Sequence, residues 1–137
     1  MIESLFQAAQ TGDAEQAQVI LQRHPSLANT ENKEGLTPLG YAAHFGHAAV
    51  VKLLLEAGAN VNALSHSKVS YIPSNTALHA AIAGERDLDV IRLLLHHGAK
   101  TVLMDSNGHT CLQVAENHGH NIELIRLLLE HGADSGQ

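Results

Sequence analysis

Eleven histidines and a single cysteine are the residues of this 137-residue chain whose side chains could do chemistry. Histidine is a common metal ligand and general base, and a cysteine thiolate is a nucleophile. The sequence nevertheless contains no H-E-x-x-H motif, no G-x-S-x-G motif and no glycine-rich phosphate loop. Its carboxylates are spread out, without the pairing that acid–base catalysis requires. We therefore expect no catalytic residues and no enzyme activity.

Cys111 is the only cysteine, so the chain can form neither an internal disulfide nor a cysteine-based zinc site. It falls at the expected first position of a helix, where the helix dipole could lower a thiol pKa. Two other segments of similar sequence have Pro38 and Ala77 at the matching position, so this position requires only a small residue. We expect Cys111 to be structural, and we predict no metal and no other cofactor.

Composition excludes several classes of partner. Fourteen acidic against eight basic residues give a net charge of −6 at pH 7, and only 3% of residues are aromatic. Negative charge opposes binding to nucleic acid and to anionic membranes. No apolar run approaches the roughly 20 residues that span a bilayer, and the first residues lack the basic start of a secretory signal. We expect a cytoplasmic protein that binds neither nucleic acid nor membrane.

The elements that position these residues repeat along the chain. Apolar triplets recur at spacings of 34, 40 and 34 residues, and they start at Val19, Leu53, Leu93 and Leu127. Before the second triplet, Thr37 suits a helix N-cap and Pro38 suits the first helical position. Each copy therefore predicts two short helices. Neither reaches the roughly 12–15 residues that make an isolated helix marginally stable, so the copies must stack.

These segments resemble the ankyrin repeat. The family pattern T-P-L-H-x-A-A, then G-H, then V-V-x-L-L-L-x-x-G-A appears at residues 37–59, with Gly40 in place of the histidine. Residues 76–81 and 110–112 keep the start of the pattern. The resemblance implies an all-α ankyrin-repeat solenoid of four helix-turn-helix units with β-turn fingers, capped at both ends. It also implies that His79 bridges neighbouring units by hydrogen bonds, a role that Gly40 and Gln113 cannot fill in the same way.

We expect one complete domain over residues 1–137, with units at about 1–31, 32–63, 64–104 and 105–137. The turn of the third unit carries a six-residue insertion, because 18 residues separate Gly58 from Thr76 whereas 12 separate Gly98 from Thr110. Terminal units need a polar outer face. Polar residues at the expected outer positions predict such caps: Gln7, Gln10, Glu15, Gln16, Gln18 and Gln22 at the start, and Gln113, Glu116 and Asn117 at the end.

The resemblance implies a concave binding face made of turn residues and the exposed side of the first helix of each unit. The matching residues are Lys33, Glu34, Leu36, His44 and Phe45 in unit two, and Ser106, Asn107, His109, Asn117 and His118 in unit four. Phe45 is expected at a solvent-facing helix position. The insertion adds Val69, Tyr71 and Ile72 on an extended arm that ends at Pro73. These three either fold back over the adjacent inner helix or form an apolar contact for a partner.

The predicted function is binding of an unidentified partner protein through this concave face, by a monomer that acts as adaptor or regulatory inhibitor. If His44, His109 and His118 lie in the interface, affinity should change between about pH 5 and 7.5. The alternative is a metal or small-molecule binder that uses the histidine-rich face. Stacked His97 and His131 make poor zinc partners, because equivalent positions lie about 8–10 Å apart and two ligand nitrogens must lie within about 4 Å.

Overall fold

Each predicted unit folds as a pair of short helices joined by a tight turn. The computed structural model describes residues 1–84, 88–119 and 121–132. These residues contain eight α-helices, one short 3-10 helix and no strand; the boundaries between units stay a prediction. The helices are α1 (Ile2–Thr11), α2 (Ala14–Arg23), η1 (Pro25–Asn29), α3 (Pro38–His44), α4 (Ala48–Glu56), α5 (Ala77–Ala83), α6 (Leu88–His96), α7 (Cys111–Asn117) and α8 (Ile122–Glu130).

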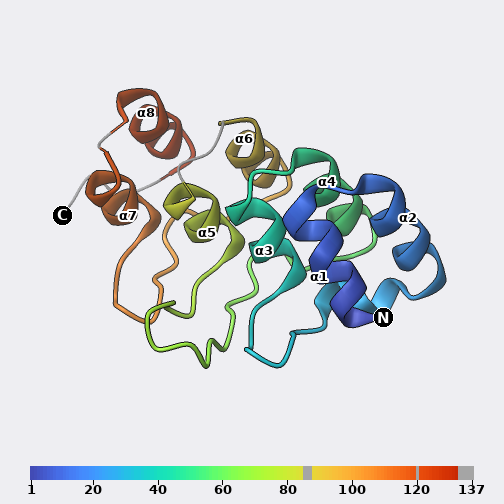
Figure 1. Ribbon diagram of the computed structural model, residues 1–137. Helices are drawn as coiled ribbons and strands as arrows, with labels where there is room; N and C mark the ends of the chain where they lie inside the picture. The colour runs from blue at the N-terminus through green and yellow to red at the C-terminus, as the bar shows by residue number, and fades with distance from the viewer. Residues whose placement is uncertain (85–87, 120, 133–137) are drawn as a thin grey trace.

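The helices stack in two layers (Figure 1). The odd-numbered helices form one row, in which α1 packs on α3, α3 on α5 and α5 on α7. The even-numbered helices form the second row, with contacts between α2 and α4 and between α4 and α6. Each odd-numbered helix also packs against the even-numbered helix that follows it. This two-layer stack is the predicted all-α architecture.

We call the odd-numbered row the inner helices. Threonine N-caps start three of them, α3, α5 and α7, as the repeat pattern predicts. The side chains of Thr37, Thr76 and Thr110 accept hydrogen bonds from the backbone N–H three residues later, at 3.0, 3.3 and 3.3 Å. At the start of α7 the Gln113 side chain accepts in return from the Thr110 N–H at 2.8 Å, which completes a capping box. These bonds satisfy backbone donors that have no partner within the helix.

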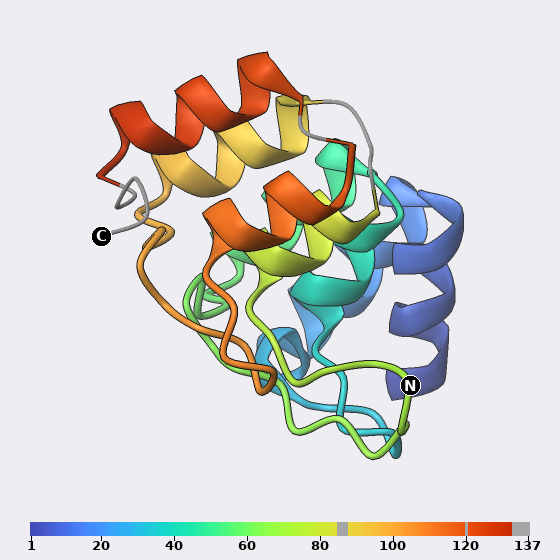
Figure 2. The ribbon, with the colours of Figure 1, turned by 90° about the vertical axis from the view of Figure 1, so that its left-hand side faces the viewer.

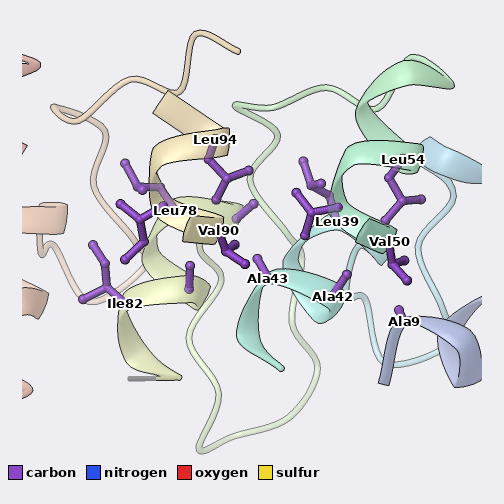
Figure 3. Close-up of a cluster of buried hydrophobic side chains, with 14 of the residues drawn as sticks. Ala9, Leu39, Ala42, Ala43, Val50, Leu54, Leu78, Ile82, Val90 and Leu94 are labelled. Carbon is purple, nitrogen blue, oxygen red and sulfur yellow. The ribbon is translucent and has the colours of Figure 1, made fainter. Parts of the chain in front are cut away.

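The core lies between the two layers and is continuous along the stack (Figure 3). Ala42 and Ala43 of α3 are fully buried, and their small side chains allow the neighbouring helices to approach closely. Leu54 of α4 and Leu94 of α6 are also fully buried and fill the space behind them. The apolar surface that each short helix buries against its neighbours stabilises the stack.

Three loops project together beyond the ends of the inner helices (Figure 2). We call them finger 2 (residues 31–37), finger 3 (residues 64–76) and finger 4 (residues 104–110). Fingers 2 and 4 are tight turns of the same kind. Asn32 Oδ1 accepts from the N–H groups two and four residues later at 3.0 Å each, and Asp105 Oδ1 does the same at 2.9 Å each. Met104 and Thr110 form an isolated β-bridge at the base of finger 4.

Finger 3 contains the predicted insertion. Its base is closed by Ser65 and Asn75: the Ser65 N–H donates to the Asn75 carbonyl, and the Asn75 N–H donates to Ser65 Oγ, both at 2.9 Å. The nine residues 66–74 of finger 3 take the place of the three residues 33–35 of finger 2. This difference accounts for the six added residues.

Backbone hydrogen bonds join the fingers side by side. The His66 N–H donates to the Gly35 carbonyl and the Lys68 N–H donates to the Glu34 carbonyl, both at 2.9 Å. On the other side, the Ser106 N–H donates to the Ser74 carbonyl at 2.8 Å. The insertion is therefore held on both sides by its neighbours.

Two asparagine side chains connect successive helix pairs on the outer side of the stack. Asn29 Nδ2 donates to the Gly58 carbonyl at 2.9 Å, and Asn62 Nδ2 donates to the Gly98 carbonyl at 3.1 Å. The Oδ1 atom of each accepts from the backbone N–H two residues beyond that glycine, at 2.8 Å in both cases. Each amide thus fixes the loop that ends the next pair.

Replacing Asn62 by alanine should lower the free energy of unfolding by about 1 kcal/mol, because two hydrogen bonds between successive pairs are lost. Urea unfolding followed by circular dichroism measures this change. Asn117, which is exposed on α7, is the matched control, and Asn117→Ala should cause no loss. Equal stability of Asn62→Ala and the wild type would show that this bridge contributes nothing.

The last helix pair is only partly capped. Gln113, Glu116 and Asn117 of α7 are exposed, as predicted for a terminal unit. On α8, however, Ile122 is 66% and Leu129 is 40% exposed. Helix α8 packs on α7, but within the described part of the chain these two apolar side chains stay exposed.

Candidate functional site

A hollow of about 780 Å³ lies between the inner helices and the fingers. Its lining comes from all three fingers and from α3, α5 and α7. A smaller hollow of about 220 Å³ adjoins it, lined by residues of α1, α3 and finger 2, and the two share Glu34 and Tyr41. We call the larger hollow the groove. Ligand pockets in proteins commonly have volumes of this order.

The structure brings most of the predicted binding residues together in the groove. Lys33 lines only the smaller hollow, and Val69 lines neither. That any of these residues contacts a partner stays a prediction. The predicted residues that line the groove are Leu36, His44, Phe45, Tyr71, Ile72, Asn107, His109 and His118, together with Glu34 and Asn117.

Phe45 is half-buried, so its expected solvent-facing position is wrong in part. It is the C-cap residue of α3, and its ring meets the Tyr41 ring edge-on with centroids 5.2 Å apart. Tyr41 in turn meets Phe6 of α1 at 5.2 Å, and His44 lies on the other side of Phe45 at 5.1 Å. Such pairs stabilise a fold beyond the area they bury. The buried part of the Phe45 side chain therefore contributes to folding, and its exposed part lines the groove.

Tyr71 stands out from the tip of finger 3 with 84% of its surface exposed. It does not fold back over the inner helix, whereas Val69 and Ile72 are half-buried. The arm has its own hydrogen bonds: the Ile72 N–H donates to the Val69 carbonyl at 3.0 Å, and the Ser67 N–H donates to Ser74 Oγ at 2.9 Å. Tyr71 is therefore the apolar residue of the insertion that is most exposed to solvent, and its contact with a partner stays a prediction.

His79 bridges two units, as the resemblance implied. Its imidazole is buried, with Nε2 2.9 Å from the His109 carbonyl oxygen and Nδ1 2.8 Å from the Thr76 hydroxyl. A carbonyl can only accept, so Nε2 carries the proton and Nδ1 accepts from Thr76. Burial lowers the pKa of His79 below its ordinary value of 6.5, although the His109 carbonyl and Asp105 act in the opposite direction. His79 is therefore a neutral structural residue.

Four other histidines, His44, His47, His97 and His131, bond to backbone carbonyls. His47 Nε2 donates to the Gln10 carbonyl at 2.8 Å and joins the first two helix pairs. His97 and His131 each donate from Nδ1 to the carbonyl four residues earlier, at 3.0 and 2.9 Å. No group of three or more His, Cys, Asp or Glu residues within the described ranges is arranged to hold a metal ion.

Cys111 is fully buried at the first position of α7. Burial raises the pKa of its thiol to about 12, and the nearby negative charge of Asp105 adds to the rise. A thiol with such a pKa carries almost no thiolate at neutral pH, so it is neither a nucleophile nor a ready metal ligand.

Tyr41, Asp105 and Gly40 are among the groove residues that sequence reasoning missed. Tyr41 could have been found from its i, i+4 spacing to Phe45, which places two aromatic rings on one side of a helix. Asp105 could have been found from its match to Asn32 in the turn pattern. Gly40 was noted only as a departure from the repeat, although its missing side chain leaves room in the groove.

Comparison with known families now identifies the scaffold. A family model described as ankyrin repeats (3 copies) matches residues 5–105 and 64–137, which together cover nearly the whole chain. The chain belongs to the ankyrin repeat family. The resemblance and the all-α solenoid are thereby confirmed, whereas the number of ankyrin repeats stays a prediction. Ankyrin repeats are protein–protein interaction modules and are generally not enzymes.

Individual ankyrin-repeat relatives are longer proteins of varied kinds. A probable E3 ubiquitin-protein ligase of Oryza sativa subsp. japonica is 36% identical over 119 residues, which is 85% of this chain and 22% of that protein. The B-cell lymphoma 3 protein homolog of Mus musculus is 33% identical over 114 residues, 83% of this chain and 24% of that protein. The chain spans less than a quarter of these relatives. No helix in the described part of the ankyrin stack is long and apolar enough to cross a membrane.

Proposed function

We propose that this ankyrin-repeat chain binds a segment of a partner protein in the groove, and acts as an adaptor or regulatory inhibitor. One observation carries the proposal. The residues that the sequence predicts to bind a partner come from three separate stretches of the chain, and most of them line one hollow of about 780 Å³. Exposed aromatic residues beside polar groups are typical of surfaces that bind proteins.

The way the groove is built favours tight binding. Backbone hydrogen bonds hold the three fingers together, and the helices behind them are packed on a continuous core. A surface that is ordered before binding loses little conformational entropy when it binds. Tyr71 has most of its surface available for burial against a partner, and a buried tyrosine is a frequent centre of binding energy.

A double variant tests the proposal. Phe45→Ala combined with Tyr71→Ala should weaken the complex with a partner captured from a lysate of the source cells by about fivefold or more. The matched control is Val19→Ala combined with Ile122→Ala, since both residues are exposed, apolar and outside the groove. Affinity for the captured partner is measured with the purified proteins, and thermal unfolding confirms that both variants fold.

Loss of the complex in the control pair, with an unchanged complex in the Phe45 and Tyr71 pair, would place binding elsewhere and contradict the proposal. Where the captured partner is an enzyme, its turnover is measured as the ankyrin protein is added. A fall in turnover identifies a regulatory inhibitor, and unchanged turnover identifies an adaptor.

A further inference from the structure

Gly40 lines the groove without a side chain, and the neighbouring unit shows which side chain stands at the same repeat position. Gly40 and His79 each lie three residues after a capping threonine. His79 fills its site with an imidazole that reaches the His109 carbonyl in the next finger. A Cβ atom built on Gly40 meets only Thr37 Oγ1, at 3.0 Å, within 4 Å. Unit two thus has no side chain at the position from which unit three extends its imidazole to the next finger.

The groove lining that includes Gly40 combines aromatic rings with a carboxylate. Tyr41 and Phe45 of α3 and Tyr71 of finger 3 line the groove together with Gly40. Glu34 lines it from finger 2 and lines the smaller hollow as well. Aromatic rings attract cations through their negative faces, and a carboxylate pairs with them directly. We refer to these five groove-lining residues, Glu34, Gly40, Tyr41, Phe45 and Tyr71, as the Gly40 pit.

Charge in the groove favours a cation over an anion. Among the described residues that line it, Glu34 and Asp105 carry carboxylates and none is lysine or arginine. Asp105 is buried, and its Oδ1 is occupied by two backbone N–H groups. The Glu34 side chain is exposed and forms no ion pair with any residue that the structure describes. Lys33 lines the smaller hollow and not the groove. The whole chain carries a net charge of −6.

The backbone of Glu34 is held in place, although its side chain is exposed. Its N–H donates to Asn32 Oδ1 at 3.0 Å, and its carbonyl accepts from the Lys68 N–H at 2.9 Å. The backbone of finger 2 therefore fixes the point from which the Glu34 side chain extends, at the junction of the two hollows. A cationic ligand pairs with this carboxylate without first having to order the finger.

We infer that the partner segment carries an arginine or lysine, and that this cationic side chain occupies the Gly40 pit with its charge beside Glu34. The inference rests on the proposed function and names the chemistry of the partner. The aliphatic stem of the ligand side chain packs on the rings of Tyr41 and Phe45, and Tyr71 covers it from finger 3. Gly40 is then a specificity-determining residue, because any side chain there would fill the space that the ligand uses.

Selection from a displayed library of random peptides tests the inference without knowledge of the natural partner. Peptides that bind the wild-type protein should share an arginine or lysine. Replacing that residue by norleucine, which keeps the aliphatic stem and removes the charge, should weaken binding about tenfold. Raising the NaCl concentration from about 50 to about 500 mM should also weaken binding, because salt screens the charge pair.

Two variants of the protein locate the cation. Glu34→Gln removes one charge at an exposed position and should weaken the selected peptides about threefold to fivefold. Glu56→Gln is the matched control, since Glu56 is exposed on α4 and lies outside the groove, and it should change nothing. Gly40→His should abolish binding while the protein stays folded, because the imidazole can bond to the Asn75 carbonyl as His79 bonds to that of His109.

The outcomes separate this inference from the proposed function. Peptides that bind the wild type but not Tyr71→Ala, and that carry no basic residue, would overturn the cationic ligand and leave the groove as a binding site. The same conclusion follows if Glu34→Gln binds these peptides as tightly as the wild type does. Peptides that bind the wild type and Tyr71→Ala equally, or a library that yields none, contradict the proposed function and the inference with it. Basic peptides that depend on Glu34 and Gly40 establish both.

Discussion

Gly35→Ala is expected to lower the free energy of unfolding by about 3 kcal/mol, through backbone strain and a clash with finger 3. Gly35 has a φ of +81°, a conformation that alanine adopts only with strain. A Cβ atom there would lie 1.9 Å from the His66 carbonyl oxygen, so the backbone of the insertion would have to move. Urea unfolding measures the loss, and displacement of the insertion should also disturb the groove.

Gly108 provides the matched control for this change. It holds the same place in finger 4, with a φ of +78°, but a Cβ atom there meets nothing within 4 Å. Gly108→Ala should therefore cost only the backbone strain, about 1 kcal/mol. Equal losses in the two variants would show that finger 3 does not pack against finger 2 in solution.

His79→Ala is expected to destabilise the protein by about 3 kcal/mol, because it leaves a cavity and removes the bridge to finger 4. The hydroxyl of Thr76, a residue that is 2% exposed, would lose the acceptor that His79 Nδ1 provides. Gln113→Ala removes the residue at the same repeat position on the exposed end and should cost about 1 kcal/mol. Urea unfolding of both variants measures the difference, and equal losses would contradict the role assigned to His79.

The contribution of His79 should also depend on pH. Its pKa in the folded protein lies below the ordinary value of 6.5, so the unfolded chain binds more protons at acidic pH. Stability therefore falls as the pH falls below about 6.5, and the contribution is fully present above that value. The advantage of the wild type over His79→Ala, measured by urea unfolding, should be larger at pH 7.5 than at pH 5. An advantage that is constant or grows on acidification would contradict the buried neutral imidazole.

The repeat pattern predicts the helices well because their signals are local. The N-caps at Thr37, Thr76 and Thr110 and the packing alanines of α3 follow directly from residue types at fixed spacing. The bridge made by His79 was expected through the family resemblance, and the structure shows it. That resemblance also indicated which faces of the units meet to form the groove, although it gave no distances.

Other features depend on contacts between distant residues and could not be predicted in the same way. Phe45 is half-buried in a cluster in which it meets Tyr41 of its own unit, and Tyr41 in turn meets Phe6 of the preceding unit. The path of finger 3 depends on hydrogen bonds to both neighbouring fingers, which its own sequence does not specify. The bridge made by Asn62 joins residues more than thirty positions apart. Ile122 is 66% exposed, whereas Leu88, one repeat period earlier on α6, is half-buried.

Hydrogen exchange measured on the protein alone and saturated with its captured partner tests the central claim most directly. Amides protected by binding report the surface that a partner covers. The account predicts added protection in fingers 2, 3 and 4 and around the ends of α3 and α7, with no change in α2 and α4. Protection confined to α2, α4 and α6, with unchanged fingers, would place the partner on the opposite face and contradict the groove as the binding site.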